Sequence, residues 1–289
     1  MFIEVGPASI VITGQMDGKP YRFDENEVKD HLGRVLAGVG DSLPVLRQKG
    51  YRIRKTLSMS PVAQKMVEAV KAIDQATLTP MAAVAGAVAD AMKEWLKEKG
   101  LEFVSVNNGG DISFFNRSGR AVSIAVGDLE KGESTPYTLV IKDMLDCGVA
   151  TSGFGGRSFT LGLADMVTVV AGTGAIADAA ATLICNATNV ESDKVLRRKA
   201  VEIDPCSDIP DEWVTVEIRE LDESLIREAL ARGLALAREL KEKNSIRAGT
   251  IVMKGHMVTT LGGDENIYME VNYGDQKADH SGRGYICGR

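Results

Sequence analysis

Residues 101–126, LEFVSVNNGGDISFFNRSGRAVSIAV, contain two turns between short runs of strand-forming residues. Valine, isoleucine and phenylalanine favour strands, and they concentrate in Leu101–Val106, Ile112–Asn116 and Ala121–Val126. The turns fall at Asn107–Asp111 and Arg117–Gly119, where glycine, asparagine and serine gather. Three strands in succession, with no helix between them, do not fit the alternating βαβ units of a doubly wound sheet. This stretch therefore predicts an α+β fold in which antiparallel sheets pack with helices.

The flanking sequence adds helices with recognisable starts and further strands. Capping residues predict helices that begin after Asp24, Ser60, Thr79 and Asp222. The third of these helices is expected to run from Met81 to Lys99 and end at Gly100, the fourth from Glu223 to Lys243, and a further helix from about Gly174 to Ala187. The remaining predicted strands are Ser9–Thr13, Tyr21–Phe23, Tyr137–Ile141, Met166–Ala171, Trp213–Ile218, Thr250–Met253 and His256–Thr260.

Composition limits the class of protein. The chain has 289 residues, 44% of them hydrophobic and 26% charged, as expected for a folded globular protein of one large domain or two small ones. Its net charge of −6 argues against general nucleic-acid binding, which needs clustered surplus basic residues. The four cysteines form no C-x-x-C pair, so free thiols in a reducing compartment are expected. The start of the chain shows no signal peptide, and the apolar windows are too short and interrupted to span a membrane, so we expect a cytoplasmic protein.

Two glycine-containing segments are candidates for ligand binding. Gly109 and Gly110 leave the backbone open to a ligand, and Asp111 can accept hydrogen bonds; a tight turn capped by Asp111 is the alternative. Thr151-Ser152-Gly153-Phe154-Gly155-Gly156-Arg157 can form a nest of backbone N–H groups for an anion, with Arg157 adding positive charge. A flexible surface loop is the alternative for that second segment.

A third signal lies on the helix predicted near residue 180. Asp178 and Thr182 are four residues apart and share one helix face, so the carboxylate and the hydroxyl can point at one place. Two hard oxygen ligands beside phosphate oxygens suit Mg²⁺. The alternative is structural: the Thr182 hydroxyl bonds back to the helix and the Asp178 carboxylate is solvated.

A dinucleotide-binding motif overlaps this helix. Gly172-Thr173-Gly174-Ala175-Ile176-Ala177 follows an apolar strand and matches G-x-G-x-x-A. The segment 190–201, where the next buried parallel strand would lie, is highly charged, and this disfavours a Rossmann fold. His31, His256 and His280 are far apart, and none has a second ligand at metal-binding spacing.

Four short motifs occur in the order seen in the ApbE superfamily, which this chain resembles over roughly residues 50–190. They are Asn107-x-Gly109-Gly110-Asp111-Ile112, Ala150-Thr151-Ser152-Gly153, Val167-Thr168-Val169 and Ala177-Asp178-x-x-Ala181-Thr182. The segments 79–86 and 149–162 are similar to a compact, uncharacterised branch of the superfamily. Characterised members are FAD:protein FMN transferases, in which Mg²⁺ beside the FAD pyrophosphate assists transfer of FMN to a threonine of a target protein.

The resemblance implies one ApbE-like (T-fold-like) domain over residues 1–289, with a polar C-terminal tail after about residue 273. It implies that Asp178 and Thr182 bind Mg²⁺ beside FAD or another phosphorylated small molecule, and that the turn formed by Gly109, Gly110 and Asp111 lines the same cleft. We expect the phosphate of this ligand to contact Thr151, Ser152, Gly153 and Arg157. The histidine-containing segment of the transferases is not found between Phe154 and Met166. A non-catalytic ligand-binding or scaffold protein is therefore the alternative to an enzyme. The sequence leaves the oligomeric state open, a homo-oligomer included.

Overall fold

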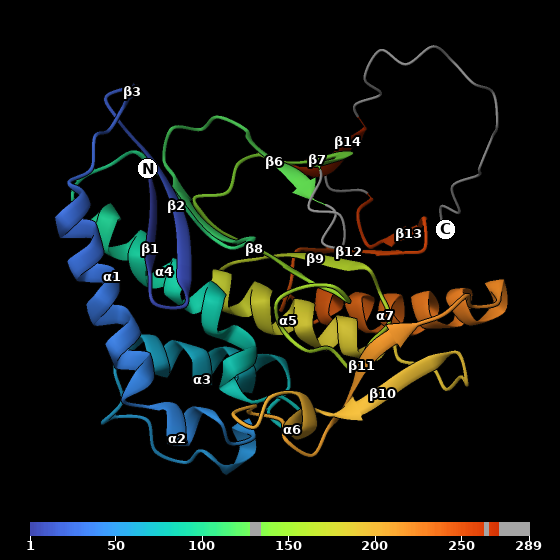
Figure 1. The fold of residues 1–289 in the computed structure, drawn as a ribbon. Coiled ribbons are helices and arrows are strands. Elements are labelled where there is room, and N and C mark those ends of the chain that lie inside the picture. The colour runs from blue at the N-terminus through green and yellow to red at the C-terminus, as the bar shows by residue number, and fades with distance from the viewer. Residues whose placement is uncertain (128–133, 263–265, 272–289) are drawn as a thin grey trace.

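The computed structural model describes residues 1–127, 134–262 and 266–271 (Figure 1). The predicted polar tail, with His280 and Cys287, lies outside these residues. The main sheet has the strand order β1-β2-β4-β5-β8-β9-β12-β13, with β3 paired to β2, and every one of its pairings is antiparallel. Its strands are β1 (Phe2–Val5), β2 (Ala8–Met16), β3 (Lys19–Pro20), β4 (Phe103–Asn108), β5 (Asp111–Asn116), β8 (Asp146–Ser152), β9 (Met166–Ala171), β12 (Ala248–Met253) and β13 (His256–Thr259).

Two smaller sheets complete the strand content of the described residues. One has the order β14-β7-β6, and the other is the two-stranded β10-β11 ribbon; both are antiparallel. Their strands are β6 (Val122–Gly127), β7 (Ser134–Ile141), β10 (Val195–Lys199), β11 (Trp213–Ile218) and β14 (Ile267–Val271). The predicted α+β class with antiparallel sheets is thus confirmed. The Rossmann alternative is wrong, because β9 pairs antiparallel with both β8 and β12.

Helices cover one face of the main sheet, and the β14-β7-β6 sheet packs on part of the other (Figure 1). The helices are α1 (Glu25–Gly40), α2 (Leu43–Leu46), α3 (Pro61–Ile73), α4 (Val84–Lys97), α5 (Gly174–Ala187), α6 (Ala200–Ile203) and α7 (Glu223–Glu242), with 3-10 turns at η1 (Gly50–Arg52) and η2 (Pro80–Ala83). Helix α5 belongs to two cores: Ala175 and Ala179 pack with α1, α3 and α4, whereas Ala180 and Ile184 pack with α7 and β12. Its small residues allow close approach on both sides.

Local signals predicted several of these elements correctly. Asp24 caps α1 by accepting from the Glu27 N–H at 2.9 Å, and Ser60 caps α3 through the Ala63 N–H at 3.4 Å. Gly100 adopts the left-handed conformation (φ +84°) after α4, as its predicted role requires. The bounds predicted for α5, β9 and β11 match the structure.

Four predictions were wrong in detail. The expected helix from Met81 is a 3-10 turn followed by α4 from Val84, and Thr79 does not cap it, because its hydroxyl donates to Asp208 instead. Strand β6 does not return beside β5; it pairs with β7 in the smaller sheet. Residues 21–23 form no strand. Asp222 stands at the start of α7 without a side-chain capping bond. In the first case a residue 129 positions away accepts from the hydroxyl that the prediction assigned to the helix N-terminus.

Candidate functional site

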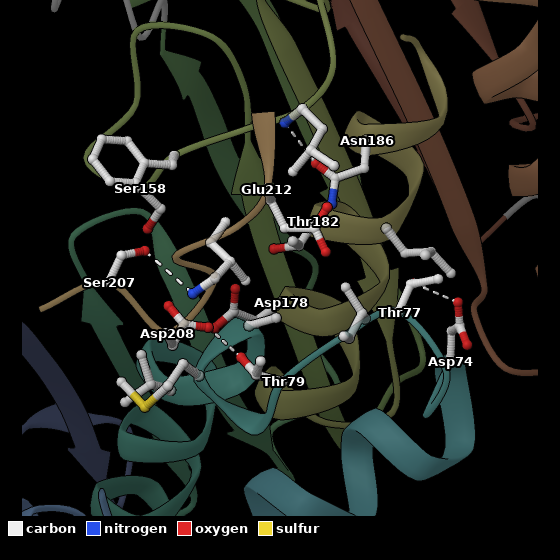
Figure 2. A pocket seen from close by; sticks show the side chains of 18 of the residues that line it. Asp74, Thr77, Thr79, Ser158, Asp178, Thr182, Asn186, Ser207, Asp208 and Glu212 are labelled. Atoms are coloured by element: carbon white, nitrogen blue, oxygen red, sulfur yellow. Dashed lines mark hydrogen bonds between the residues drawn. The ribbon is translucent and has the colours of Figure 1, made fainter. Parts of the chain in front are cut away.

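A cavity of about 720 Å³ lies between the start of α4, the exposed side of α5 and the segment joining β10 to β11 (Figure 2). Four of the predicted site residues line it: Asp111, Arg157, Asp178 and Thr182. They come from β5, from the loop after β8, and from α5. Figure 2 shows Asp178 and Thr182 directed into the cavity from α5.

The close packing of α4 on α5 fixes where these side chains stand. A Cβ added to Gly86 of α4 would lie 2.1 Å from the carbonyl oxygen of Gly174 in α5, so the two backbones touch. Asp90 of α4 is 2% exposed and accepts from the N–H groups of Gly174 (2.8 Å) and Ala175 (2.9 Å) at the start of α5. Its carboxylate fills the helix N-terminus, where the G-x-G-x-x-A motif would otherwise bind a phosphate. This is a second reason why the dinucleotide-binding interpretation fails.

Asp178 of α5 makes the reciprocal interaction, because its carboxylate accepts a hydrogen bond at the start of α4. Its Oδ2 accepts from the N–H of Gly86 at 3.0 Å, in the first turn of α4. The side chain is surrounded by protein on almost all sides, yet it keeps surface on the cavity. Burial raises the pKa of Asp178 well above its usual value, and the nearby charge of Asp111 raises it further, against the N–H groups of Gly86 and Ala85. Asp178 therefore holds two helices together and is also one of two neighbouring carboxyl groups on the cavity.

The Thr182 hydroxyl stands one helical turn away. It is half-buried, lines the cavity, and forms no hydrogen bond with any residue that the structure describes. The back-bond to the helix, which was the structural alternative, is not formed. A hydroxyl that points into a cavity without a protein partner is free to bind a ligand, a cation or water.

Asp111 and Arg157 meet at the turn between β4 and β5. Gly109 and Gly110 both have positive φ (+66° and +111°), which the turn requires. A Cβ on Gly109 would lie 1.3 Å from Nη2 of Arg157, so the guanidinium rests directly on this glycine. Burial raises the pKa of Asp111 to about 7, while the Thr151 N–H and the Arg157 charge act in the opposite direction. The paired glycines thus bring Arg157 and Asp111 to the same rim of the cavity.

Gly109 and Gly110 do not themselves line the cavity, and neither do the other predicted contacts, Thr151, Ser152 and Gly153. Thr151 and Ser152 belong to β8, which the sequence did not predict as a strand. The Thr151 N–H donates to Oδ1 of Asp111 at 3.3 Å, and its hydroxyl pairs with that of Thr168 at 3.1 Å. One N–H group of the expected nest, that of Thr151, is therefore bonded to Asp111 and helps to orient the Asp111 carboxylate. That these three residues bind phosphate stays a prediction.

Several cavity residues were not predicted. Arg47, Lys49, Thr79, Asp208 and Glu212 also line the cavity. Lys49 Nζ lies 2.9 Å from Glu212 Oε1, and Thr79 donates to Asp208. These pairs join residues more than 120 positions apart. No local pattern in the sequence marks them.

The residues on α5 fit a magnesium ion by the chemistry of their donor atoms. Among the described residues, no three His, Cys, Asp or Glu side chains are grouped to hold a metal ion. A protein cage for Zn²⁺ is thus absent from that part of the chain. Mg²⁺ needs fewer protein ligands than Zn²⁺, because it commonly binds one or two carboxylates and completes its octahedral coordination with water and ligand phosphates. Asp178 and Thr182 offer such a partial set, and a cation there would offset the repulsion between Asp178 and Asp111.

Among the described residues, no helix has the length and apolar character needed to cross a membrane.

Comparison with known proteins places the chain in a family. Residues 1–259 match the sequence model of a family described as "AbpE bacteria". A UPF0280 protein from Methanopyrus kandleri is 37% identical over 185 residues, which cover 64% of this chain and 69% of the relative. Another from Methanospirillum hungatei is 33% identical over 130 residues, 45% of this chain and 53% of the relative. The chain thus spans only about half the length of several such relatives.

Two solved structures are also similar. The flavin transferase ApbE from Vibrio cholerae aligns with a TM-score of 0.45 at 14% identity, over 92% of this chain and 98% of that protein. The flavinyl transferase ApbE from Pseudomonas stutzeri, in its apo form, aligns with a TM-score of 0.41 at 16% identity, over 89% and 96%. Given the family match over residues 1–259 and the four motifs in order, the chain belongs to the family described as AbpE bacteria, within the ApbE superfamily.

Proposed function

We propose that this protein binds a flavin nucleotide, or a related phosphorylated small molecule, in the cavity beside α5, with Mg²⁺ bridging the ligand to Asp178 and Thr182. One observation carries the proposal. Predicted site residues from three separate segments line one cavity: Asp111 on β5, Arg157 in the loop after β8, and Asp178 and Thr182 on α5. Asp111, Asp178 and Thr182 are residues of the superfamily motifs, and Arg157 is the predicted phosphate-binding side chain. Membership of the ApbE superfamily supports the choice of a flavin nucleotide.

Each of the three side chains has a different role in binding the cation or the phosphate. Asp178 supplies the charge for the cation, and its bond to Gly86 holds the carboxylate in place. Thr182 adds a neutral oxygen that no described residue uses. Arg157, held over Gly109, is placed to attract a phosphate oxygen at the rim. When bound, the cation would neutralise the ligand's phosphate charge and polarise its pyrophosphate. The three described cysteines are free thiols, which supports a cytoplasmic location as part of the proposal.

The test is a calorimetric titration with FAD, with and without Mg²⁺, on the wild type and on Thr182→Val. Valine has nearly the shape of threonine but lacks the hydroxyl, and no described residue loses a hydrogen bond, so the variant should fold normally. We expect the Mg²⁺-dependent part of FAD binding to weaken about tenfold, the effect of losing one ligand-positioning group. Thr13→Val, the same change on the exposed face of β2, is the matched control. The proposal is contradicted if the affinity for FAD does not depend on Mg²⁺, or if Thr182→Val leaves that affinity unchanged.

A second assay separates an enzyme from a scaffold. Transfer of FMN from FAD to a threonine hydroxyl forms a phosphoester, releases AMP and frees the hydroxyl proton, so AMP is the product to measure. Asp178→Asn is the informative variant, because the amide oxygen can still accept from Gly86 while the negative charge is gone. AMP release that Asp178→Asn abolishes supports an enzyme. FAD binding without AMP release supports the scaffold alternative, which the missing histidine segment between Phe154 and Met166 favours.

A further inference from the structure

The segment that joins β10 to β11 runs along the cavity and is longer than a hairpin requires. Residues 200–212, here called the strap, comprise α6 and the loop that follows it, whereas hairpin connections usually need two to five residues. Two backbone hydrogen bonds close its base, from Ala200 N to Glu212 O (2.9 Å) and from Val201 N to Pro210 O (3.1 Å). Its middle adds Asp204, Cys206, Ser207, Asp208 and Ile209 to the cavity wall.

Two side-chain contacts, here called the latches, tie the strap to the opposite wall of the cavity. The first is the ion pair between Lys49 and Glu212 at 2.9 Å. The second is the hydrogen bond that Thr79 donates to Oδ2 of Asp208, drawn in Figure 2. No backbone–backbone hydrogen bond joins the strap to that wall within the described part of the chain. The contacts that join the strap to Lys49 and Thr79 are therefore side-chain contacts that a competing ligand can replace.

The donors in the latches are groups that an anionic ligand needs. Lys49 Nζ also donates to the Thr77 carbonyl at 2.6 Å, which fixes its direction and leaves one N–H free. Arg47, two residues earlier, lines the same end of the cavity and pairs with no described residue. The side chains of Lys49 and Glu212 are 26% and 39% exposed, so dissolved anions can reach this pair. The carboxylates of Asp208 and Glu212 thus accept from donors on the cavity wall that phosphate oxygens could use instead.

We propose that the strap is an autoinhibitory lid: Asp208 and Glu212 occupy Thr79 and Lys49 in the free protein, and a phosphate-bearing ligand that takes these donors releases the strap. This gives the cavity a second anion-binding position, at Lys49 and Thr79. The inference needs a phosphoanion but neither a flavin nor a metal ion, so it can be tested apart from the proposed function.

Two double variants break the same latches from opposite sides. Asp208→Asn with Glu212→Gln removes the competing carboxylates and keeps the donors. Lys49→Met with Thr79→Val removes the donors and keeps the carboxylates. If the latches only supported the cavity wall, both variants would impair binding. If they compete with the ligand, the variants change binding in opposite directions.

The probe is inorganic pyrophosphate, titrated by calorimetry without a divalent metal. We expect the strap-carboxylate variant to bind it about tenfold more tightly than the wild type, since each displaced contact costs the ligand several-fold in affinity, and the donor variant to bind about tenfold more weakly. The control is Asp211→Asn with Glu202→Gln, which removes the same charge from the strap without touching a latch. Among the described residues, Glu202 pairs with Arg198 of β10 and with no other basic side chain. The control should bind like the wild type.

Hydrogen–deuterium exchange gives a readout that needs no ligand. Amides of residues 200–212 should exchange faster in both latch variants than in the wild type, and at the wild-type rate in the control, because the latches are the side-chain contacts that hold the strap against Lys49 and Thr79. The proposal is overturned if exchange is unchanged when the latches are broken. It is also overturned if the strap-carboxylate variant binds pyrophosphate no more tightly than the control, or not at all.

Discussion

Replacing Gly86 with alanine tests whether contact between α4 and α5 positions the site. Helix propensity alone predicts that alanine stabilises a helix interior by about 1 kcal/mol. The structure predicts the opposite sign, because the new Cβ would lie 2.1 Å from the Gly174 carbonyl oxygen and 2.4 Å from its carbon. Neither backbone can rotate away, so the helices must separate by about 1 Å to restore an ordinary contact.

The expected cost combines three effects. Overpacking a close-packed interior costs about 1–3 kcal/mol and more where backbone must move. Separation of the helices also stretches the bond from Gly86 N to Asp178, worth about 1 kcal/mol. With the gain in propensity of about 1 kcal/mol subtracted, we expect Gly86→Ala to lower the free energy of unfolding by about 1–3 kcal/mol. At roughly 2–4 °C per kcal/mol for a chain of this size, Tm should fall by about 2–12 °C.

The assay is thermal and urea unfolding followed by far-UV circular dichroism, with Gly33→Ala as the control. Gly33 lies inside α1, and a Cβ there would meet no atom within 4 Å. That variant should be more stable than the wild type by about 0.5–1 kcal/mol. If Gly86→Ala is as stable as Gly33→Ala, the two helices do not meet as closely as the structure has them, and the placement of Asp178 loses its explanation.

Three further predictions concern buried polar groups. Asp90→Ala should lower the free energy of unfolding by about 3–5 kcal/mol in urea melts, because it leaves three buried donors without their acceptor: the N–H groups of Gly174 and Ala175 at the start of α5 and the Ser113 hydroxyl on β5. An effect below about 1 kcal/mol would contradict the capping role. Burial raises the pKa of Asp146, but its two lysine partners outweigh burial and hold it below the ordinary value, so its share of stability is present above about pH 4 and lost as pH falls further. The acid-unfolding curve of Asp146→Asn should be flatter in that range; a curve parallel to the wild type would refute the assignment. Burial raises the pKa of Cys147 to about 12 and that of Cys185 to about 11. In a Cys287→Ser background, only the exposed Cys206 should therefore react with a thiol reagent at pH 8, as measured by peptide mass spectrometry. Labelling of Cys147 or Cys185 in the folded protein would contradict the packing.

The sequence by itself determined what depends on neighbours along the chain. Capping residues and helical spacing gave α1, α3 and α5, and the run of adjacent strands gave the antiparallel α+β class. The four-residue spacing of Asp178 and Thr182 placed both side chains on one helix face, because an α-helix repeats every 3.6 residues. The structure retains that relation and opens the shared face to a cavity.

Tertiary structure alone decided how distant residues meet. Thr79 carried a correct local signal for a helix cap, yet its hydroxyl turns to Asp208, and the first turn of α4 is bonded by Asp178 instead. Strand β8 escaped prediction because its small residues have weak strand preference; it is fixed by pairing with β5 and β9. The latches of the strap join segments more than 120 residues apart. Such contacts depend on sheet register and on the closeness of two helix backbones, and these follow from packing of the whole chain, which no local run of residues encodes.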